Sequence, residues 1–417
     1  MISSIGILSS WLLFLLLGII FFTNNLLKIH IYIRLIVFLN IFLFLLLEIG
    51  LFIDDFSVAY ISNYSASSTP PLYKFASLWG ALDGSILLWN LTLSIFMLFY
   101  LSNYKISKSN VDTKIYSSIM LFFVGYTIFS SSPFAGCIEA SNIGCNSSSL
   151  LPFQNLVSSQ IGRGPNPLLQ NHPLMAIHPP FLYIGYVGMS APFVATISRL
   201  ALRNSNNEWI SIAQKLTFIP WLFLTIGISL GAIWSYEVLG WGGYWAWDPV
   251  ETGSILPWFA LLMIVHARAR TDSEKESAII ASPALGMLAG ALAIHATLVT
   301  RANGVWASVH SFVGNEEARE YNDPYIRIVQ LFDDGAAGLE VAGYFLIMIS
   351  LCFAAFLWLV KQQEKLLDSS SKTSMLIENR QLSIVLLIAT IALGIWMGST
   401  AVTFVGGALM FLLIKGD

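Results

Sequence analysis

Residues 31–52 read IYIRLIVFLNIFLFLLLEIGLF, and Arg34 and Glu48 are the only charged residues in this stretch. A helix needs about 20 mostly apolar residues to cross the hydrocarbon core of a bilayer, so the stretch predicts a transmembrane helix. The whole chain has the same character, because 56% of its 417 residues are hydrophobic, 11% are charged and the mean hydropathy is +0.71. No soluble core needs that excess of apolar side chains. We expect an all-α integral membrane protein, built as a polytopic helix bundle.

Comparable apolar runs recur on both sides of this stretch and predict 10–11 transmembrane helices. The expected spans are 5–22, 31–52, 75–101, 115–133, 175–198, 215–234, 253–269, 279–300, 340–360, 382–397 and 400–415. Only Gly398 and Ser399 separate the last two, which form either a tight hairpin or one long tilted helix. The chain then divides into a four-span N-terminal part (1–133), an outer loop (134–174), a central part (175–339) and a C-terminal part of two or three spans (340–417).

The distribution of Lys and Arg predicts how these helices are oriented. Cytoplasmic loops of membrane proteins carry an excess of positive charge. One set of connections holds 16 of the 21 Lys and Arg residues and the alternate set holds 5. We therefore expect the N-terminus on the outer side of the membrane, together with four long segments: 53–74, 134–174, 235–252 and 301–339. The first span has no Lys or Arg before it and no small-residue cleavage site after it, so we expect it to be retained.

Net charge and cysteine content exclude several classes of protein. A net charge of −3 provides no basic footprint for nucleic acid. The chain has no CxxC or CxxCH, so it is neither a thioredoxin-type reductant nor itself a c-type cytochrome. Cys137 and Cys145 share an outer loop, where a disulfide is permitted, and they form either a bridge or two separate thiols. Cys352 lies within a span and is expected to be a small apolar filler.

The densest chemical signal is the segment 234–258, WSYEVLGWGGYWAWDPVETGSILPW, with five tryptophans at the outer membrane surface. An interfacial belt of aromatic residues explains some of these rings. It does not explain Gly240, Gly242 and Gly243 between them, because glycine allows a sharp turn and a close approach of the backbone to a ligand. Such a surface suits a planar, amphipathic macrocycle such as heme. The two readings are therefore a ligand platform and an aromatic belt.

Two histidines in outer loops flank this segment. His178 begins the fifth span and His310 follows the eighth, so both lie on the outer side and can converge over the tryptophan loop. Heme iron commonly takes axial histidine. The pair is a candidate ligand set for heme, and the alternative is a structural role for each. His172 precedes His178 closely, but the two prolines after His178 fix its backbone geometry and favour it.

The remaining ionisable residues of the spans are weaker signals. His266 is expected roughly 20 Å below the outer surface, at about 1.5 Å per residue. An ionisable side chain at that depth is costly and by default functional; the alternative is a histidine near the inner end of its helix, beside basic residues. His295 lies near the outer end of its span and His30 lies in an inner loop. Glu48 and Asp83 are expected to cap or pair locally.

The sequence resembles the CcmF heme-lyase family of cytochrome c-type biogenesis, part of a heme-handling superfamily with a tryptophan-rich "WWD" loop. That loop appears as GWGGYWAWDPVE (240–251). Three further stretches match: YKFASLWGALDGSILLW (73–89), GPNPLLQ with HPPFLYIGYVG (within 164–188), and TLVTRANGVWASVHSF (297–312). The CcmC and CcsA relatives share the WWD loop, but the stretches 73–89 and 297–312 favour CcmF.

The resemblance implies a role for each matching residue. His178 and His310 would bind the iron of a transient heme on the outer face, delivered by a CcmE-like heme chaperone. His266 would be one axial ligand of a resident heme b that passes electrons to the heme in transit. Heme would then be attached to the CxxCH thiols of apocytochrome c, with a CcmH-like subunit as a further partner. The heme-handling core would be 175–339 with its WWD loop at 235–252, and the residues that cradle heme would be Trp241, Trp245, Trp247 and Asp248.

Two departures from the family pattern bear on this comparison. Leu82 stands before Asp83 where the family usually has histidine. The second ligand of heme b normally comes from a C-terminal region that is not matched, and no histidine follows His310. The chain is therefore interpreted as a short or split form. Either a second CcmF-type chain supplies that ligand, or His295 substitutes for it, or heme b is absent.

These features favour a heme-ligation component of a cytochrome c heme lyase. Its membrane would be a prokaryotic plasma membrane or the mitochondrial inner membrane, with the WWD loop in the periplasm or the intermembrane space. An alternative from the same superfamily is a heme-presenting partner that loads a heme chaperone. A non-heme transporter or structural subunit is the third hypothesis. Transporters usually place their special residues near the midplane, whereas here they gather at the outer face.

Overall fold

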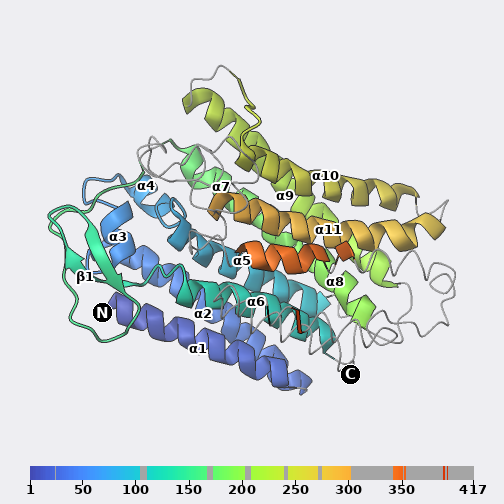
Figure 1. Cartoon of the computed structure of the whole chain (residues 1–417), viewed down its shortest axis with the longest axis horizontal. Helices are drawn as coiled ribbons and strands as arrows, with labels where there is room; N and C mark the ends of the chain where they lie inside the picture. Colours follow the sequence, from blue (N-terminus) through green and yellow to red (C-terminus); the bar gives the residue numbers. More distant parts are fainter. Residues whose placement is uncertain are drawn as a thin grey trace.

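A computed structural model of the chain describes residues 1–23, 25–103, 110–166, 172–201, 208–238, 243–270, 275–301, 341–350 and 352–353, with the single positions 388, 389 and 392. The described residues are mostly helical (Figure 1). The helices are α1 (Ile2–Phe22), α2 (Leu26–Phe52), α3 (Ala59–Tyr64), α4 (Pro71–Ala76), α5 (Leu82–Asn103), α6 (Val111–Phe129), α7 (Leu174–Gly188), α8 (Ser190–Ala201), α9 (Glu208–Val238), α10 (Pro249–Arg270) and α11 (Lys275–Arg301). A further helical stretch covers Val341–Ser350.

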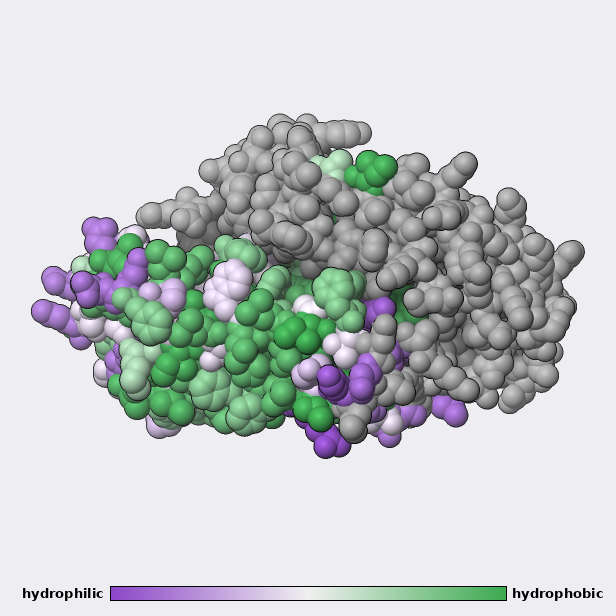
Figure 2. Space-filling model, turned by 90° about the horizontal axis from the view of Figure 1, so that it is seen from below, coloured by the Kyte–Doolittle hydropathy of each residue, from purple (hydrophilic) through white to green (hydrophobic). Residues whose placement is uncertain are grey.

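Six helical stretches of the described residues are long and apolar enough to cross a membrane. They are Ile2–Phe22, Lys28–Phe52, Leu82–Asn103, Leu174–Ser198, Lys215–Val238 and Pro249–His266. Figure 2 shows a largely hydrophobic surface over the N-terminal part of the chain. Exposed side chains such as Leu15 on α1 and Phe38 on α2 contribute to it. A surface of this kind is solvated by lipid, and the expected class of all-α integral membrane protein is confirmed.

The helices pack as one bundle with the N-terminal helices on one side and α7 to α11 on the other (Figure 1). Helix α1 packs against α2 and α6, and α5 lies between α2, α6 and α7. Helices α10 and α11 form an antiparallel hairpin, and α9 packs against both α7 and α10. Because α5 and α7 are in contact, the N-terminal ends of these two helices meet at the end of the bundle that also carries α3 and α4.

The predicted span 75–101 is wrong at its N-terminal end, because α5 begins only at Leu82. The Tyr60 hydroxyl of α3 donates to the carbonyl oxygens of Ser77 (2.6 Å) and Leu78 (2.9 Å), which holds a turn between α4 and α5. Burial raises the pKa of Tyr60 well above its ordinary value, so the phenol stays protonated and remains a donor. At Gly84 an added Cβ would overlap the Leu78 carbonyl oxygen, so this turn needs glycine on α5.

A two-stranded antiparallel hairpin lies beside α3, formed by β1 (Gly136–Ala140) and β2 (Cys145–Ser149). Cys137 and Cys145 are joined by a disulfide with a Cα–Cα distance of 5.9 Å. Of the two alternatives left open by the sequence, the structure therefore contains the bridge. Strand β2 contacts α3, and Figure 1 shows the hairpin at the same end of the bundle as α3 and α4.

Several predictions concern residues outside the described part of the chain. They include the spans 382–397 and 400–415 apart from three single positions, and the predicted outer segment 301–339 apart from Arg301. The loop residues 104–109, 202–207 and 271–274 also lie outside the described part. The division into the parts 1–133, 134–174, 175–339 and 340–417 stays a prediction. Cys352 is buried and carries a free thiol, as expected for an apolar filler.

Candidate functional site

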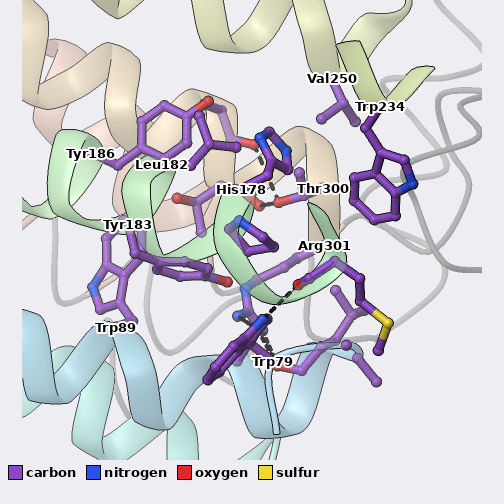
Figure 3. Close-up of a pocket in the computed structure, with 18 residues that line it drawn as sticks. Trp79, Trp89, His178, Leu182, Tyr183, Tyr186, Trp234, Val250, Thr300 and Arg301 are labelled. Carbon is purple, nitrogen blue, oxygen red and sulfur yellow. Dashed lines mark hydrogen bonds between the residues drawn. The ribbon is translucent and has the colours of Figure 1, made fainter. Parts of the chain in front are cut away.

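A cavity of about 130 Å³ lies where the four sequence stretches of the expected family meet (Figure 3). Trp79 comes from the stretch 73–89, His178 and Tyr183 come from 164–188, Val250 comes from the WWD loop, and Arg301 comes from 297–312. Trp234, which precedes the WWD loop, completes the wall beside His178. Stretches that are far apart in sequence thus line one small space at the end of the bundle.

His178 is held by the backbone of the neighbouring helix. Its Nδ1 lies 2.7 Å from the Gly227 carbonyl oxygen of α9. A carbonyl can only accept, so in the neutral ring Nδ1 carries the proton and Nε2 carries the lone pair. Histidines that ligate metals are commonly oriented in this way, by donating their other N–H to a carbonyl or carboxylate. The half-buried imidazole is therefore in the tautomer that a metal ion requires.

Two glycines of α9 make room for that imidazole. Gly227 and Gly231 are one helical turn apart, and α7 crosses over them. An added Cβ at Gly231 would lie 2.6 Å from Cε1 of His178, and one at Gly227 would lie 2.9 Å from the backbone nitrogen of Leu182. Small residues at this spacing allow membrane helices to approach closely. The glycine pair is therefore what lets α9 carry a hydrogen-bond acceptor so near to His178.

The prolines after His178 connect α7 to the stretch 73–89. Pro179 has no N–H, so it leaves the carbonyl of Met175, four residues earlier, without its helical donor. The indole Nε1 of Trp79 donates to this carbonyl oxygen at 2.9 Å. Trp79 thus replaces the missing helical hydrogen bond, and the start of α7 is tied to the turn that precedes α5.

His172 and His178 both contact Trp234 but are not equivalent. Nδ1 of His172 accepts from the Leu174 N–H (3.2 Å), and its Nε2 lies 2.7 Å from a carboxylate oxygen of Glu237. Both ring nitrogens of His172 are therefore occupied. Its ring stacks on Trp234 at 6.3 Å and 16°, whereas His178 meets the same indole edge-on at 5.8 Å and 69°. The choice of His178 over His172 as a heme ligand stays a prediction, and it is supported by the two contacts of the His172 ring nitrogens.

The sequence WDPVE forms the start of α10 and fixes the end of the tryptophan loop. Asp248 precedes the helix, and its Oδ1 accepts from the Val250 N–H at 2.8 Å. Glu251 reaches back, and its Oε2 accepts from the N–H groups of Asp248 (3.3 Å) and Ala246 (2.9 Å). This is a capping box with proline at the first helical position. Asp248 therefore has a structural role in addition to the predicted role of cradling a ligand.

The described part of the loop presents aromatic rings at the surface. Tyr244 stacks on Tyr236 of α9 at 4.4 Å and 18°, and both rings are about half exposed. Trp247 has a φ of 59°, and its side chain is 71% exposed. Trp245 meets Trp247 edge-on at 5.9 Å, and its buried indole N–H has no hydrogen-bond partner among the described residues. The loop thus offers exposed ring faces and one free donor. Trp241 lies outside the described residues.

Arg301, the last residue of α11, is buried on the opposite wall of the cavity from His178 in the view of Figure 3. Its guanidinium donates to the Leu82 carbonyl oxygen (3.0 Å) and to the Ser85 Oγ (2.7 Å) of α5. It also lies over the Tyr126 ring, 5.6 Å from the centroid. These contacts tie the end of α11 to the N-terminus of α5. His310, nine residues further along the chain, lies outside the described residues.

His266 and His295 do not form a site together. His266 is exposed on α10, and its Nδ1 lies 2.9 Å from the Leu262 carbonyl oxygen. Gly253 of α10 lies opposite Ala296 of α11, with 3.5 Å between an added Cβ and the Ala296 Cα. His295 is therefore level with Gly253, and His266 is about 20 Å further along the antiparallel pair. The expectation that His295 could replace the missing ligand of a heme at His266 is wrong.

Four residues of the site were not predicted as functional, namely Trp79, Arg301 and the glycine pair of α9, Gly227 and Gly231. The pattern Gly-x-x-x-Gly at 227–231 is a recognised signal for close helix packing. Asp-Pro-Val-Glu is likewise a readable capping box. No sequence pattern predicts the hydrogen bond of Trp79, because its acceptor is the backbone carbonyl of Met175, which only the fold brings near.

Comparisons with known proteins agree with this geometry. The profile of the family described as Cytochrome C assembly protein matches residues 79–299, more than half of the chain. The "Cytochrome c-type biogenesis protein ccl1" of Rhodobacter capsulatus is 34% identical over 292 residues, which are 69% of this chain and 41% of that protein. The CcmF protein of Pseudomonas aeruginosa is 36% identical over 271 residues, which are 63% of this chain and 38% of that protein.

A solved structure described as "Cytochrome c Heme Lyase CcmF" shares the fold, with a TM-score of 0.55 and 24% identity. The match covers 99% of this chain and 68% of that one. The chain spans about two fifths of the length of the curated relatives named above. The predicted resemblance to CcmF proteins is confirmed, and the chain belongs to the cytochrome c assembly protein family.

Proposed function

We propose that the chain binds heme at the outer face of the membrane and takes part in its attachment to apocytochrome c. The observation that carries this proposal is the state of His178. It is half-buried at a cavity lined by all four matched stretches, and the contact of its Nδ1 with the Gly227 carbonyl oxygen orients the ring in the way that is common for metal-ligating histidines. A belt of interfacial aromatic residues would need neither the oriented His178 ring nor four sequence stretches that line one cavity.

The described residues fit the group. A cavity of about 130 Å³ is smaller than the pockets of roughly 300–1,000 Å³ that enclose drug-sized ligands, so a porphyrin ring cannot lie inside it. We place the ring at the mouth of the cavity, on the side of the tryptophan loop. This loop supplies Val250 to the cavity wall, and its Tyr244 and Trp247, with Tyr236 of α9, expose aromatic faces. In this arrangement His178 provides one axial ligand. His310 provides the second, and Trp241, Trp245, Trp247 and Asp248 line or support the site.

Two independent features support a site on the outer side of the membrane. The Lys and Arg distribution places the tryptophan loop outside. The Cys137–Cys145 disulfide lies at the end of the bundle that carries α3, and Tyr60 of α3 contacts the turn next to the cavity. Disulfides persist in oxidising compartments. We therefore place the site on the periplasmic or intermembrane-space side.

The partners proposed are those of heme delivery and attachment: a CcmE-like heme chaperone, a CcmH-like subunit and apocytochrome c. Attachment adds each cysteine S–H across a vinyl C=C of heme, so it needs no net oxidant or reductant. The contribution of this chain is to hold the iron and orient the ring. His266 is a candidate ligand for a heme b, and its exposure on α10 leaves the second ligand to a second CcmF-type chain.

The test is covalent heme attachment in membranes that contain this chain and an apocytochrome with a CxxCH motif. Wild-type chain is expected to support heme-stained cytochrome, and His178→Ala and His310→Ala are expected to reduce it at least tenfold. His30→Ala is the matched control, because His30 is exposed and distant in sequence from all four stretches. Attachment at the wild-type level with His178→Ala would contradict the proposal. Loading of the chaperone without attachment would favour the heme-presenting alternative.

A further inference from the structure

The cavity beside His178 contains a buried cation that the proposed role of His178 does not use. Arg301 is 2% exposed and lines the same cavity as His178. The guanidinium donates two hydrogen bonds to α5, to the Leu82 carbonyl oxygen and to Ser85 Oγ, and it also interacts with the Tyr126 side chain. Both partners are neutral, and both belong to the N-terminal turn of α5. The guanidinium is therefore positioned by the protein but not neutralised by these contacts.

No carboxylate of the described residues lies within ion-pair distance of Arg301. Asp83 interacts with the Arg301 guanidinium electrostatically, at a distance longer than an ion pair. The Asp83 carboxylate accepts a 2.5 Å hydrogen bond from Ser131 Oγ. Tyr126 contributes its ring face, and the Tyr183 hydroxyl points toward the guanidinium (Figure 3). Removing a charge from water without a close counter-ion is costly. An anionic ligand in the cavity would supply the close counter-ion that Arg301 lacks among the described residues.

We infer that Arg301 binds the propionate edge of heme, so that the carboxylates point into the cavity and the vinyl groups point outward. This inference rests on the proposed function. Guanidinium binds carboxylate through paired N–H donors with strict geometry. The cavity volume of about 130 Å³ suits the side arms of one porphyrin edge and excludes the ring. Ser85, Thr297 and Thr300 also line the cavity, and their hydroxyl groups donate to backbone carbonyls of their own helices.

This orientation has a direct consequence for attachment. The propionates and the vinyl groups occupy different edges of heme. With the propionates held by Arg301 behind His178, the vinyl groups face the outer solution. That is the side from which the thiols of an unfolded apocytochrome approach. Arg301 is thus a specificity residue that presents the reactive edge of heme, and it does not touch the reacting atoms.

The test is binding of hemin and of hemin dimethyl ester to the purified full chain, followed by absorbance. The two compounds have the same ring and iron, but the ester lacks the carboxylates. Wild type is expected to bind hemin about 10- to 100-fold more tightly than the ester, the range that a charged hydrogen-bonded pair supplies. Arg301→Gln is expected to reduce this ratio to near one. Arg163→Gln, at an exposed arginine, is the matched control and should keep the wild-type ratio.

Several outcomes would overturn the inference. One is equal affinity of the wild type for hemin and its ester, and this result decides the matter even where Arg301→Gln does not fold. Another is an unchanged ratio in a folded Arg301→Gln. A third is a ratio that exists in phosphatidylcholine bicelles and is lost in phosphatidylglycerol bicelles, because the anion bound by Arg301 would then be a lipid headgroup. Arg301→Lys, which keeps the charge, should restore part of the ratio.

Failure of the inference and failure of the proposed function are distinguishable. If hemin binds through His178 without discrimination against the ester, only the role of Arg301 is wrong. If the wild type binds no hemin, or binds it equally well after His178→Ala, the proposed function itself is wrong.

Discussion

The substitution Gly231→Ala tests whether the α9 backbone holds His178 in place. The added Cβ would lie 2.6 Å from Cε1, 3.1 Å from Nδ1 and 3.2 Å from Nε2 of the His178 ring. Ordinary contact between carbon atoms is about 3.5–4.0 Å, so the imidazole must move by about 1 Å. That movement lengthens the 2.7 Å contact between Nδ1 and the Gly227 carbonyl oxygen beyond a hydrogen bond.

The magnitude follows from two opposing effects. Alanine is favoured over glycine within a helix by about 1 kcal/mol. Overpacking costs typically 1–3 kcal/mol, and the lost hydrogen bond costs a further 0.5–1.5 kcal/mol or so. We expect a small net loss of stability. The larger effect is on hemin binding, because the imidazole loses both its position and its tautomer, and the hemin affinity should fall roughly tenfold or more.

The assay is hemin titration of the purified variant, with the thermal unfolding midpoint as the measure of stability. Gly18→Ala is the matched control, because Gly18 also lies within a membrane helix and an added Cβ there meets no atom within 4 Å. The control should keep the wild-type hemin affinity and should not lose stability. Wild-type hemin affinity in a folded Gly231→Ala would refute the role assigned to this glycine.

Three further predictions concern stability, each read from the unfolding midpoint in detergent. Trp79→Phe removes the donor to the Met175 carbonyl oxygen that Pro179 leaves free, and should cost about 1–3 kcal/mol; no change would mean that another group satisfies that carbonyl. Glu251→Ala should cost about 1 kcal/mol through loss of the capping box, whereas Gln, which keeps an acceptor, should cost less than half as much; equal effects would contradict the capping role. Reduction of the Cys137–Cys145 disulfide should lower the free energy of unfolding by about 2–3 kcal/mol. The reductant should not affect a variant with serine at both positions, and an effect on that variant would contradict the assignment.

The membrane class and the positions of most helices could be predicted from the sequence, and the choice of His178 over His172 stays a prediction. Apolar length determines spanning helices, and the two prolines after His178 mark a fixed backbone. The start of α5 could not be predicted, because the stretch from 75 onward is mostly apolar and shows no clear break before Leu82. It is the Tyr60 hydroxyl, distant in sequence, that binds the Ser77 and Leu78 carbonyls and holds the turn.

The limits of sequence reasoning at the site have a common physical origin. The stretch WDPVE was interpreted as part of a ligand cradle, yet Asp248 and Glu251 cap α10. A polar side chain at a helix start commonly accepts hydrogen bonds from the backbone, because the first N–H groups of the helix have no acceptor within the helix. Arg301 was counted only as a charge in an outer loop. Its burial follows from tertiary packing of α11 against α5, which no local pattern reports.

The central claim, that this chain binds heme iron through His178, is tested most directly by hemin binding to His178→Ala and His172→Ala. Both variants remove an imidazole that contacts Trp234, but both ring nitrogens of His172 already have partners, the Leu174 N–H and the Glu237 carboxylate. We predict that His172→Ala keeps the absorbance spectrum of bis-histidine heme and that His178→Ala loses it, because only His310 would then remain as a histidine ligand. Retention of that spectrum in His178→Ala, or its loss in His172→Ala alone, would contradict the account.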